Sequence, residues 1–385
     1  MAPLPAPSPE AAEHSRVLTD LIAGRIVEAG GWIPFAEYMS LALYAPGLGY
    51  YTAGARKLGA AGDFVTAPEL TPVFGRAVAV QAAQVLEAID GGDILELGAG
   101  SGRLAVDMLV ELERLGHLPG RYCILDVSAD LRERQQALVS AEIPHLSDRL
   151  VWLDSLPERF AGFIVGNEVL DALPVHLIHW QSGKVKERGV AWSSGPGFVW
   201  EDRMLAAGRL FETAQSLPVH SDDYLSEINL AAPALVHSLA AGLERGLILF
   251  LDYGFPRAEY YHPDRRTGTL MCHYRHQAYD DPFFLPGLAD ITAHVDFTAV
   301  ADAALDAGLE VQGYASQAHF LINCGALASL ERYGPGSVAY LKQAAAVQKL
   351  IQPSEMGELF KVVAMAKSLD VLPIGSGVGD KRHTL

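Results

Sequence analysis

The chain has 385 residues, which suits either one large α/β domain with additions or two domains. Half of the residues are hydrophobic, but no apolar run approaches the ~18–20 residues of a membrane-spanning helix, so we expect no membrane span. The formal net charge of −17, from 46 acidic and 29 basic residues, argues against a nucleic-acid partner, because phosphate neutralisation needs clustered Lys and Arg.

The first ten residues, MAPLPAPSPE, contain no basic residue and no apolar core. We therefore predict a disordered start over residues 1–12, and neither a secretory nor a transit peptide. Apolar residues then fall on one side of a helix predicted over 13–28, and a second helix is predicted after Pro34. With the long glycine- and aromatic-rich loop that follows, residues 13–75 are interpreted as an N-terminal helical cap.

Three cysteines stand far apart without a C-x-x-C pair, at positions 123, 272 and 324. This spacing indicates neither a disulfide framework nor a cysteine zinc site. His273 and His276 lie close to Cys272, but no other cluster of metal-ligand residues has a matching spacing. No metal site is therefore predicted. Free thiols fit a reducing compartment, and the expected location is the cytoplasm.

The residues Thr66-Ala-Pro-Glu69 have the form of a capping box with proline in the first turn. They predict a helix that runs past Phe74 to about Ala88. Glu69 is therefore interpreted as a cap and not as a catalytic residue.

Residues 93–102, DILELGAGSG, are the most informative stretch of the chain. An apolar run containing Glu96 is followed by glycines at 98, 100 and 102 and then by apolar residues at helical spacing, which is typical of a strand, a tight turn and a helix. Such glycines let the backbone approach a bound ligand closely. The third glycine comes one position too early for the dinucleotide pattern G-x-G-x-x-G. The pattern E-x-G-x-G-x-G instead resembles the first motif of class I S-adenosylmethionine-dependent methyltransferases.

Acidic and amide side chains end two further predicted strands. Asp126 ends the strand 122–127, where its carboxylate can accept from both hydroxyls of a ribose, although a surface Asp at a strand end is the plainer alternative. Asn167 and Glu168 follow the strand predicted over 162–166. Because ligands bind beyond the carboxyl ends of strands in open α/β sheets, these side chains are expected in one crevice with the glycines.

We assign residues 76–175 to the first part of the cofactor-binding core. An insertion is predicted over 176–245, with a β-hairpin up to residue 199 and helical pieces after it. Residues 246–367 complete the core and include a loop, 255–298, predicted to act as a lid. Residues 368–385 form a C-terminal tail.

These elements predict an α/β protein with a Rossmann-like, seven-stranded mixed sheet whose last strand is antiparallel. The late strands of this sheet are predicted at 309–314, 319–321 and 361–366. The helical cap and the β-plus-helix insertion are additions to that sheet.

Six segments in order are similar to those of the complex I assembly-factor methyltransferases, and the resemblance covers roughly residues 13–367. The segments are GDFVTAPEL (62–70), ILELGAGSGRLAVDML (94–109), NEVLDALPVH (167–176), FLDYG (250–254), ADITAHVDFTA (289–299) and EMGELFKVVAMAK (355–367). Mitochondrial members symmetrically dimethylate an arginine of a complex I core subunit. The resemblance implies a class I methyltransferase fold, S-adenosyl-L-methionine as cofactor, and a protein substrate of the complex I subunit type. One departure is Asp126-Val-Ser, where the family has Glu-Pro-Ser.

The resemblance also implies roles for single residues. Those that line the cofactor are Glu96, Gly98, Gly100, Gly102, Asp126, which holds the ribose, and Asn167. Glu168 would lie where cofactor and acceptor meet. Because an arginine guanidinium must be oriented by carboxylates, Glu168 and then Asp63 are the candidate catalytic residues. Asp252 and Asp296 are further candidates, and Asp171 more simply braces a turn.

Other functions remain open at this point. A methyltransferase of a small molecule or of another side chain is one alternative, and a non-catalytic assembly partner that retains the fold is another. A nicotinamide dehydrogenase is disfavoured because the glycine spacing is wrong. The sequence does not predict the oligomeric state.

Overall fold

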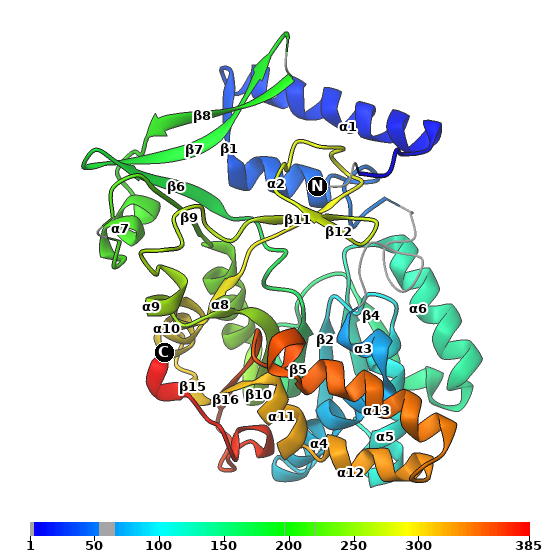
Figure 1. The fold of residues 1–385 in the computed structure, drawn as a ribbon. Helices are drawn as coiled ribbons and strands as arrows, with labels where there is room; N and C mark the ends of the chain where they lie inside the picture. The colour runs from blue at the N-terminus through cyan, green and yellow to red at the C-terminus, as the bar shows by residue number, and fades with distance from the viewer. Residues whose placement is uncertain (1–3, 54–65, 196, 220) are drawn as a thin grey trace. The chain divides into compact units, whose positions relative to one another are not determined.

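The computed structural model of the protein describes residues 4–53, 66–195, 197–219 and 221–385 (Figure 1). The chain forms two compact units, each built from distant stretches of sequence. The sheet unit contains Val65–Leu170, Pro233–Gly254 and Phe297–Leu385, and the insertion unit contains Met1–Phe64, Asp171–Ala232 and Phe255–Asp296. Among the described residues, none of the helices combines the length and hydrophobicity needed to cross a lipid bilayer.

Among the described residues, the main sheet has eight strands, and seven of them form its path in the order β15-β16-β10-β5-β2-β3-β4. Their bounds are β2 (Asp93–Leu97), β3 (Tyr122–Leu125), β4 (Leu150–Leu153), β5 (Phe160–Asn167), β10 (Leu243–Phe255), β15 (Glu310–Ser316) and β16 (Phe360–Lys367). On this path, β16 runs antiparallel to its neighbours, β10 and β15, and the other described strand pairs are parallel. The predicted seven-stranded mixed sheet with an antiparallel last strand is confirmed.

Helices of the sheet unit cover its sheet. They are α3 (Ala67–Leu70), α4 (Pro72–Ala88), α5 (Arg103–Leu115), α6 (Ala129–Glu142), α8 (Ala231–Gly242), α10 (Phe297–Asp306), α11 (Gln317–Asn323), α12 (Ala326–Leu330) and α13 (Val338–Ile351). Helices α4 and α5 pack against each other, and α12 and α13 contact α4 (Figure 1). Helix α13 and the two short helical turns of the tail, η4 (Ile374–Ser376) and η5 (Arg382–Thr384), were not predicted.

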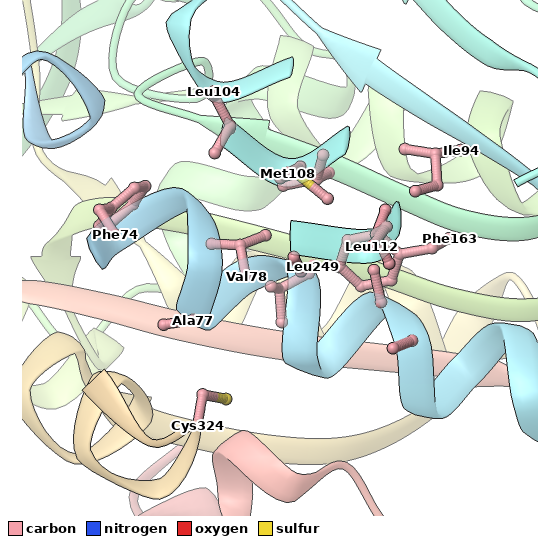
Figure 2. Packing of buried hydrophobic residues seen from close by; sticks show 14 of the residues in the cluster. Phe74, Ala77, Val78, Ile94, Leu104, Met108, Leu112, Phe163, Leu249 and Cys324 are labelled. Atoms are coloured by element: carbon pink, nitrogen blue, oxygen red, sulfur yellow. The ribbon is translucent and has the colours of Figure 1, made fainter. Parts of the chain in front are cut away.

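The core of the sheet unit explains why β10 is so apolar. Leu247, Leu249 and Leu251 join one hydrophobic cluster with α4 and α5, while the alternating Ile248 and Phe250 are buried on the other face. Figure 2 shows side chains of this cluster, including Phe74, Val78, Met108, Leu112, Phe163 and Leu249. A strand covered on both faces needs apolar residues at every position.

Two local predictions in the sheet unit are wrong. The helix predicted from Thr66 breaks at Thr71, whose φ is −163°, because Pro72 disfavours a helical conformation in the residue before it. Thr71 then caps α4, its hydroxyl accepting from the Val73 N–H at 3.1 Å. The strand predicted over 319–321 is instead helix α11, which Ser316 caps.

The insertion unit contains an antiparallel sheet in the order β1-β7-β6-β9, with β8 paired to β7, and a three-stranded sheet in the order β12-β11-β13. The strands are β1 (Trp32–Pro34), β6 (His176–Gln181), β7 (Lys184–Ser193), β8 (Gly197–Met204), β9 (Tyr224–Ile228), β11 (Met271–Tyr274), β12 (Gln277–Tyr279), β13 (Asp290–Thr292) and β14 (Val295–Asp296). The helices are α1 (Pro9–Glu28), α2 (Phe35–Tyr44), α7 (Arg209–Ser216) and α9 (Arg257–Tyr260).

Several boundaries in the insertion unit differ from the prediction. Helix α1 begins at Pro9, within the expected disordered start, because Ser8 caps it by accepting from the Ala11 N–H at 3.2 Å. The helical pieces predicted after 201 include strand β9. The expected loop 255–298 contains helix α9 and four strands, of which β11, β12 and β13 pair with one another. Most of α8, predicted as insertion, belongs to the sheet unit.

One hydrophobic cluster joins the three stretches of the insertion unit. Leu18 and Ile22 of α1, Val190 of β7, and Cys272 and Ile291 of the small sheet all belong to it. The predicted cap, insertion and lid loop therefore share one core. Whether residues 255–298 act as a lid stays a prediction.

Candidate active site

The sheet register brings the predicted strand-end residues together. Leu97 of β2 is paired with Leu125 of β3 on one side and with Gly166 of β5 on the other. The residues that directly follow these three are Gly98, Asp126 and Asn167. Three predicted site residues thus lie side by side at the carboxyl edge of parallel strands.

The glycine loop has a backbone that other residues adopt only with strain. Gly98, Gly100 and Gly102 have φ values of 62°, 55° and 85°. A Cβ at Gly102 would lie 3.2 Å from the Cγ of Gln135 on α6. The loop therefore needs glycine for its conformation and, at Gly102, for packing as well.

Glu96 is buried in β2, with 2% of its surface exposed. Burial raises the pKa of its carboxyl to about 7, although the hydrogen bond that the Tyr122 hydroxyl donates at 2.7 Å opposes this rise. Among the described residues, no cationic side chain pairs with Glu96. A cationic group of a ligand beside this carboxyl would favour its ionised form.

Asp126 is held by backbone and side-chain donors. Its Oδ1 accepts from the Ser128 N–H at 3.0 Å and its Oδ2 from Nε2 of Gln135 at 2.9 Å. The same Nε2 donates to the carbonyl of Gly100 at 2.9 Å, so Gln135 connects Asp126 to the glycine loop. Burial raises the pKa of Asp126 above its ordinary value.

Sequence reasoning missed Gln135, which is fully buried. Its spacing of four residues from the buried Leu131 and Val139 places it on the inward face of α6. A polar residue on an apolar helix face was the signal that could have found it, because buried polar groups require partners.

Asn167 is the last residue of β5, and Glu168 directly follows it. Glu168 has a φ of 53°, unusual for a residue with a side chain, and its N–H donates to the Leu251 carbonyl at 2.9 Å. Nδ2 of Asn167 donates to Oε1 of Glu168 at 3.2 Å. Oδ1 of Asn167 is buried with no hydrogen-bond donor among the described residues. A buried amide oxygen without a donor points to a ligand at this position.

Asp252 holds the turn that presents Glu168. It is completely buried, and its Oδ2 accepts from the Val169 and Leu170 N–H groups at 3.1 and 2.8 Å. Its Oδ1 accepts from the Tyr253 N–H at 2.9 Å. Asp252 was a candidate to orient an acceptor. In the structure, both of its carboxylate oxygens accept hydrogen bonds from backbone N–H groups and so hold the turn in place.

Glu69 is not a helix cap. Its carboxylate accepts a hydrogen bond from the Ser101 hydroxyl of the glycine loop. The capping interpretation is wrong because Thr66 makes no side-chain capping bond and the helix that begins there ends at Leu70. Glu69 of α3 thus stabilises the glycine loop through its contact with Ser101.

The other candidate residues belong to the insertion unit or lie outside the described part of the chain. Asp63 lies outside the described residues. In the insertion unit, Asp296 pairs with Arg257 at 3.3 Å, and Oδ1 of Asp290 accepts from the Tyr51 hydroxyl at 2.9 Å. In the described part of the chain, no group of three or more His, Cys, Asp or Glu side chains is arranged to hold a metal ion.

Residues 77–315 match the model of a family of S-adenosyl-L-methionine-dependent methyltransferases. This match spans more than half of the chain. The chain belongs to this methyltransferase family. The crystal structure of a superfamily member from Burkholderia thailandensis bound to S-adenosyl-homocysteine is 46% identical, with a TM-score of 0.96 and complete coverage of both chains. A second, native structure from the same organism is also 46% identical and has a TM-score of 0.93.

Curated relatives are more distant but match most of the chain. The Drosophila melanogaster protein arginine methyltransferase NDUFAF7 homolog, mitochondrial, is 29% identical over 89% of this chain and 85% of its own length. The Danio rerio protein arginine methyltransferase NDUFAF7, mitochondrial, is 29% identical over 88% of this chain and 84% of its own length. The class I methyltransferase fold and the resemblance to this family are both confirmed.

The cofactor of this methyltransferase is S-adenosylmethionine, which supplies a methyl group activated by a sulfonium. The strand-end residues fit such a group. The glycine loop offers an open backbone, the buried Glu96 lacks a cationic partner in the part of the chain described, and Oδ1 of Asn167 lacks a donor there. The individual roles of these residues stay predictions, which the experiments below address.

Proposed function

We propose that this methyltransferase modifies an arginine side chain of a protein, a subunit of the respiratory complex I type. The observation that carries this proposal is the match over 89% of the chain to relatives named protein arginine methyltransferases. The six sequence segments shared with the complex I assembly-factor methyltransferases support the same acceptor. The acidic balance of the chain, with a net charge of −17, favours approach of a basic acceptor segment.

Glu168 is the residue that we assign to the acceptor. Its backbone is fixed by the bond from its N–H to Leu251 and by the adjacent turn that Asp252 holds. A carboxylate can accept two hydrogen bonds from a guanidinium in parallel, which orients the group and leaves one nitrogen free to face the methyl group. Alignment of the reacting atoms is the main task of the protein when the leaving group is already activated.

Asn167 would complete this arrangement from the cofactor side. Its Nδ2 holds one Glu168 oxygen at 3.2 Å, while its Oδ1 is available to a ligand donor. The pair therefore connects the cofactor and acceptor positions through one short contact.

The three cysteines are free and buried, which supports a reducing compartment, and we propose the cytoplasm as the location.

The experiment that tests the proposal uses methyl-labelled S-adenosylmethionine. The pure protein is incubated with it and with a lysate from cells that lack the protein, and labelled bands are identified by mass spectrometry. We expect a labelled arginine in one respiratory-chain subunit. Label on another side chain or on a small molecule would contradict the arginine assignment, and tight cofactor binding without any label would favour the assembly-partner alternative.

Two variants sharpen this experiment. Glu168→Gln removes the charge that orients the guanidinium and is expected to lower the rate on the order of 100-fold, with cofactor affinity nearly unchanged. Glu133→Gln, an exposed glutamate on α6, is the matched control and should label at the normal rate. Equal rates for both variants would remove Glu168 from its assigned role.

A further inference from the structure

The sheet unit contains a pocket, which we call the arginine pocket. It has a volume of about 340 Å³ and lies among α4, α5, α11, α12 and the short turns η2 (Glu331–Tyr333) and η4 (Ile374–Ser376). None of the predicted cofactor residues lines it. Glu111 of α5, which does line it, is eight residues beyond Arg103 at the start of that helix, or about 12 Å along the axis.

Two of the three guanidiniums in the pocket share one carboxylate. Glu111 is almost fully buried, and it accepts from both terminal nitrogens of Arg332 at 2.5 and 2.6 Å. Arg114 donates to the same carboxylate at 2.7 and 3.1 Å. Burial alone would raise the pKa of Glu111, but the bonds from Arg332 and Arg114 lower it below the ordinary value. One negative charge thus faces two positive charges.

The third guanidinium, Arg76 of α4, has weaker partners. It donates to the Ser329 hydroxyl at 3.4 Å and lies over the ring of Tyr333, 5.2 Å from its centroid. Among the described residues, no carboxylate lies within ion-pair distance of Arg76. The charge of Arg76 acts to lower the pKa of Asp107, but the ion pair of Asp107 is with Arg103, at 3.1 Å. Arg76 is therefore a half-buried cation at the pocket wall that retains capacity for an anion.

The pocket combines this charge with an apolar wall. Three arginines and one glutamate leave an excess of two positive charges, in a chain whose net charge is −17. Arginine stays protonated at any physiological pH, so the excess is permanent. Ala77, Val80 and Ala328 supply apolar surface in the same pocket. The combination is that of a small-molecule site, in which a few charged groups orient a ligand against an apolar lining.

We propose that the arginine pocket binds a small organic anion with a phosphate or carboxylate group and an apolar body. The anionic group pairs with Arg76 and with the free donors of Arg114 and Arg332, whose forked geometry matches both kinds of oxyanion. The apolar body lies against the alanine and valine side chains. This site is separate from the methyl-transfer function and does not depend on it.

The test is calorimetric titration of the whole protein, saturated with S-adenosylhomocysteine so that the cofactor site is filled. The probes are phenyl phosphate, benzoate and inorganic phosphate. We expect saturable binding of phenyl phosphate or benzoate, and the tighter of the two identifies the anionic group. Inorganic phosphate should bind at least tenfold more weakly than phenyl phosphate, because it has no apolar body. No saturable binding of either aromatic probe would overturn the proposal.

Variants connect the binding to the pocket. Arg76→Gln should weaken binding of the aromatic anion at least tenfold. Arg76→Lys keeps the charge but loses the forked guanidinium donors, so its affinity should lie between those of Arg76→Gln and the parent protein. Arg159→Gln removes the same charge from an arginine that is 80% exposed on the sheet unit and should bind normally. Circular dichroism confirms that each variant is folded. Equal affinity in Arg76→Gln and Arg159→Gln would place the anion elsewhere and overturn the proposal.

Discussion

Each unit of the molecule buries a glutamate on a β-strand, and the two glutamates differ in how many hydrogen bonds their carboxylates accept. In the insertion unit, Glu227 of β9 is 1% exposed and accepts from the Thr269 and Leu270 N–H groups at 2.8 and 2.9 Å and from the Tyr260 hydroxyl at 3.1 Å. In the sheet unit, Glu96 is as deeply buried, yet Tyr122 is its one donor among the described residues.

We propose that this difference separates a structural carboxylate, Glu227, from a cofactor-binding one, Glu96. Glu227 lies where donors from the stretch after α9 converge, so its burial is compensated within the fold. The burial of Glu96 is compensated poorly, and the cost appears as a carboxyl pKa raised to about 7. We infer that a bound ligand completes the environment of Glu96.

The largest expected effect tests the structural side of this comparison. Glu227→Ala removes the acceptor for two backbone N–H groups and for the hydroxyls of Ser226, Tyr260 and Thr269, and should lower the free energy of unfolding by about 3–5 kcal/mol. The affinity of the folded protein for S-adenosylmethionine should not change. Urea denaturation and calorimetric titration measure the two quantities. Weaker cofactor binding at normal stability would make Glu227 functional and break the comparison.

The second effect tests the functional side. The folded pKa of Glu96 is about 7 against an ordinary value of 4.5, so its cost to folding is absent below pH 4.5, grows up to about pH 7 and is complete above it. Glu96→Gln removes this ionisation and should raise the stability of the cofactor-free protein at pH 8 by up to about 3 kcal/mol. The same change should weaken binding of S-adenosylmethionine at least tenfold, since the carboxylate that favours a cation is gone.

Urea denaturation at pH 5 and pH 8 provides the internal control for Glu96→Gln. At pH 5 the parent protein and the variant should be nearly equal in stability, because Glu96 is protonated in the folded parent protein. A variant that is less stable at both values would show that the carboxylate is structural, as in Glu227.

The third effect separates backbone strain from site geometry within one helix. Gly102 and Gly116 flank α5 and have φ values of 85° and 78°. Alanine at either position should cost about 1–2 kcal/mol of stability, because the left-handed conformation disfavours a Cβ. Only Gly102→Ala should also weaken cofactor binding, since its Cβ would press on Gln135, whereas nothing lies within 4 Å at Gly116. Thermal unfolding and titration distinguish the two, and equal affinities would exclude Gln135 as a support of the site.

The smallest effect concerns a carboxylate of the insertion unit with the opposite pH dependence. Asp202 accepts from Arg188 at 2.7 Å and from His179 at 2.6 Å; burial alone would raise its pKa, but these bonds lower it below 3.8. Its stabilising contribution is therefore present above pH 3.8 and is lost as the pH falls through the folded pKa. Asp202→Asn should cost about 1 kcal/mol at pH 7 and less at pH 3, by urea denaturation. A cost that grows on acidification would reverse the assignment.

Much of the sheet unit follows from local sequence. The glycine loop, Asp126 and Asn167 each come directly after a short apolar run, and parallel strands place such ends side by side. Strand β9 was missed because its five residues, YLSEI, lie in a polar stretch and have no period long enough to distinguish a strand from a helix. Helix α11 was read as a strand for the same reason, since Ser316 caps only seven residues.

Sequence alone determined which polar residues follow the strands, the glycine loop and the cofactor, because these depend on contiguous residues and on rules for parallel sheets. The tertiary structure decided that three stretches, Met1–Phe64, Asp171–Ala232 and Phe255–Asp296, form one unit. It also decided that Gln135 holds Asp126, that Asp252 holds the turn at Glu168, and that three arginines meet in one pocket. Each of these depends on contacts between residues far apart in the chain, and local periodicity carries no information about which distant side chains will meet.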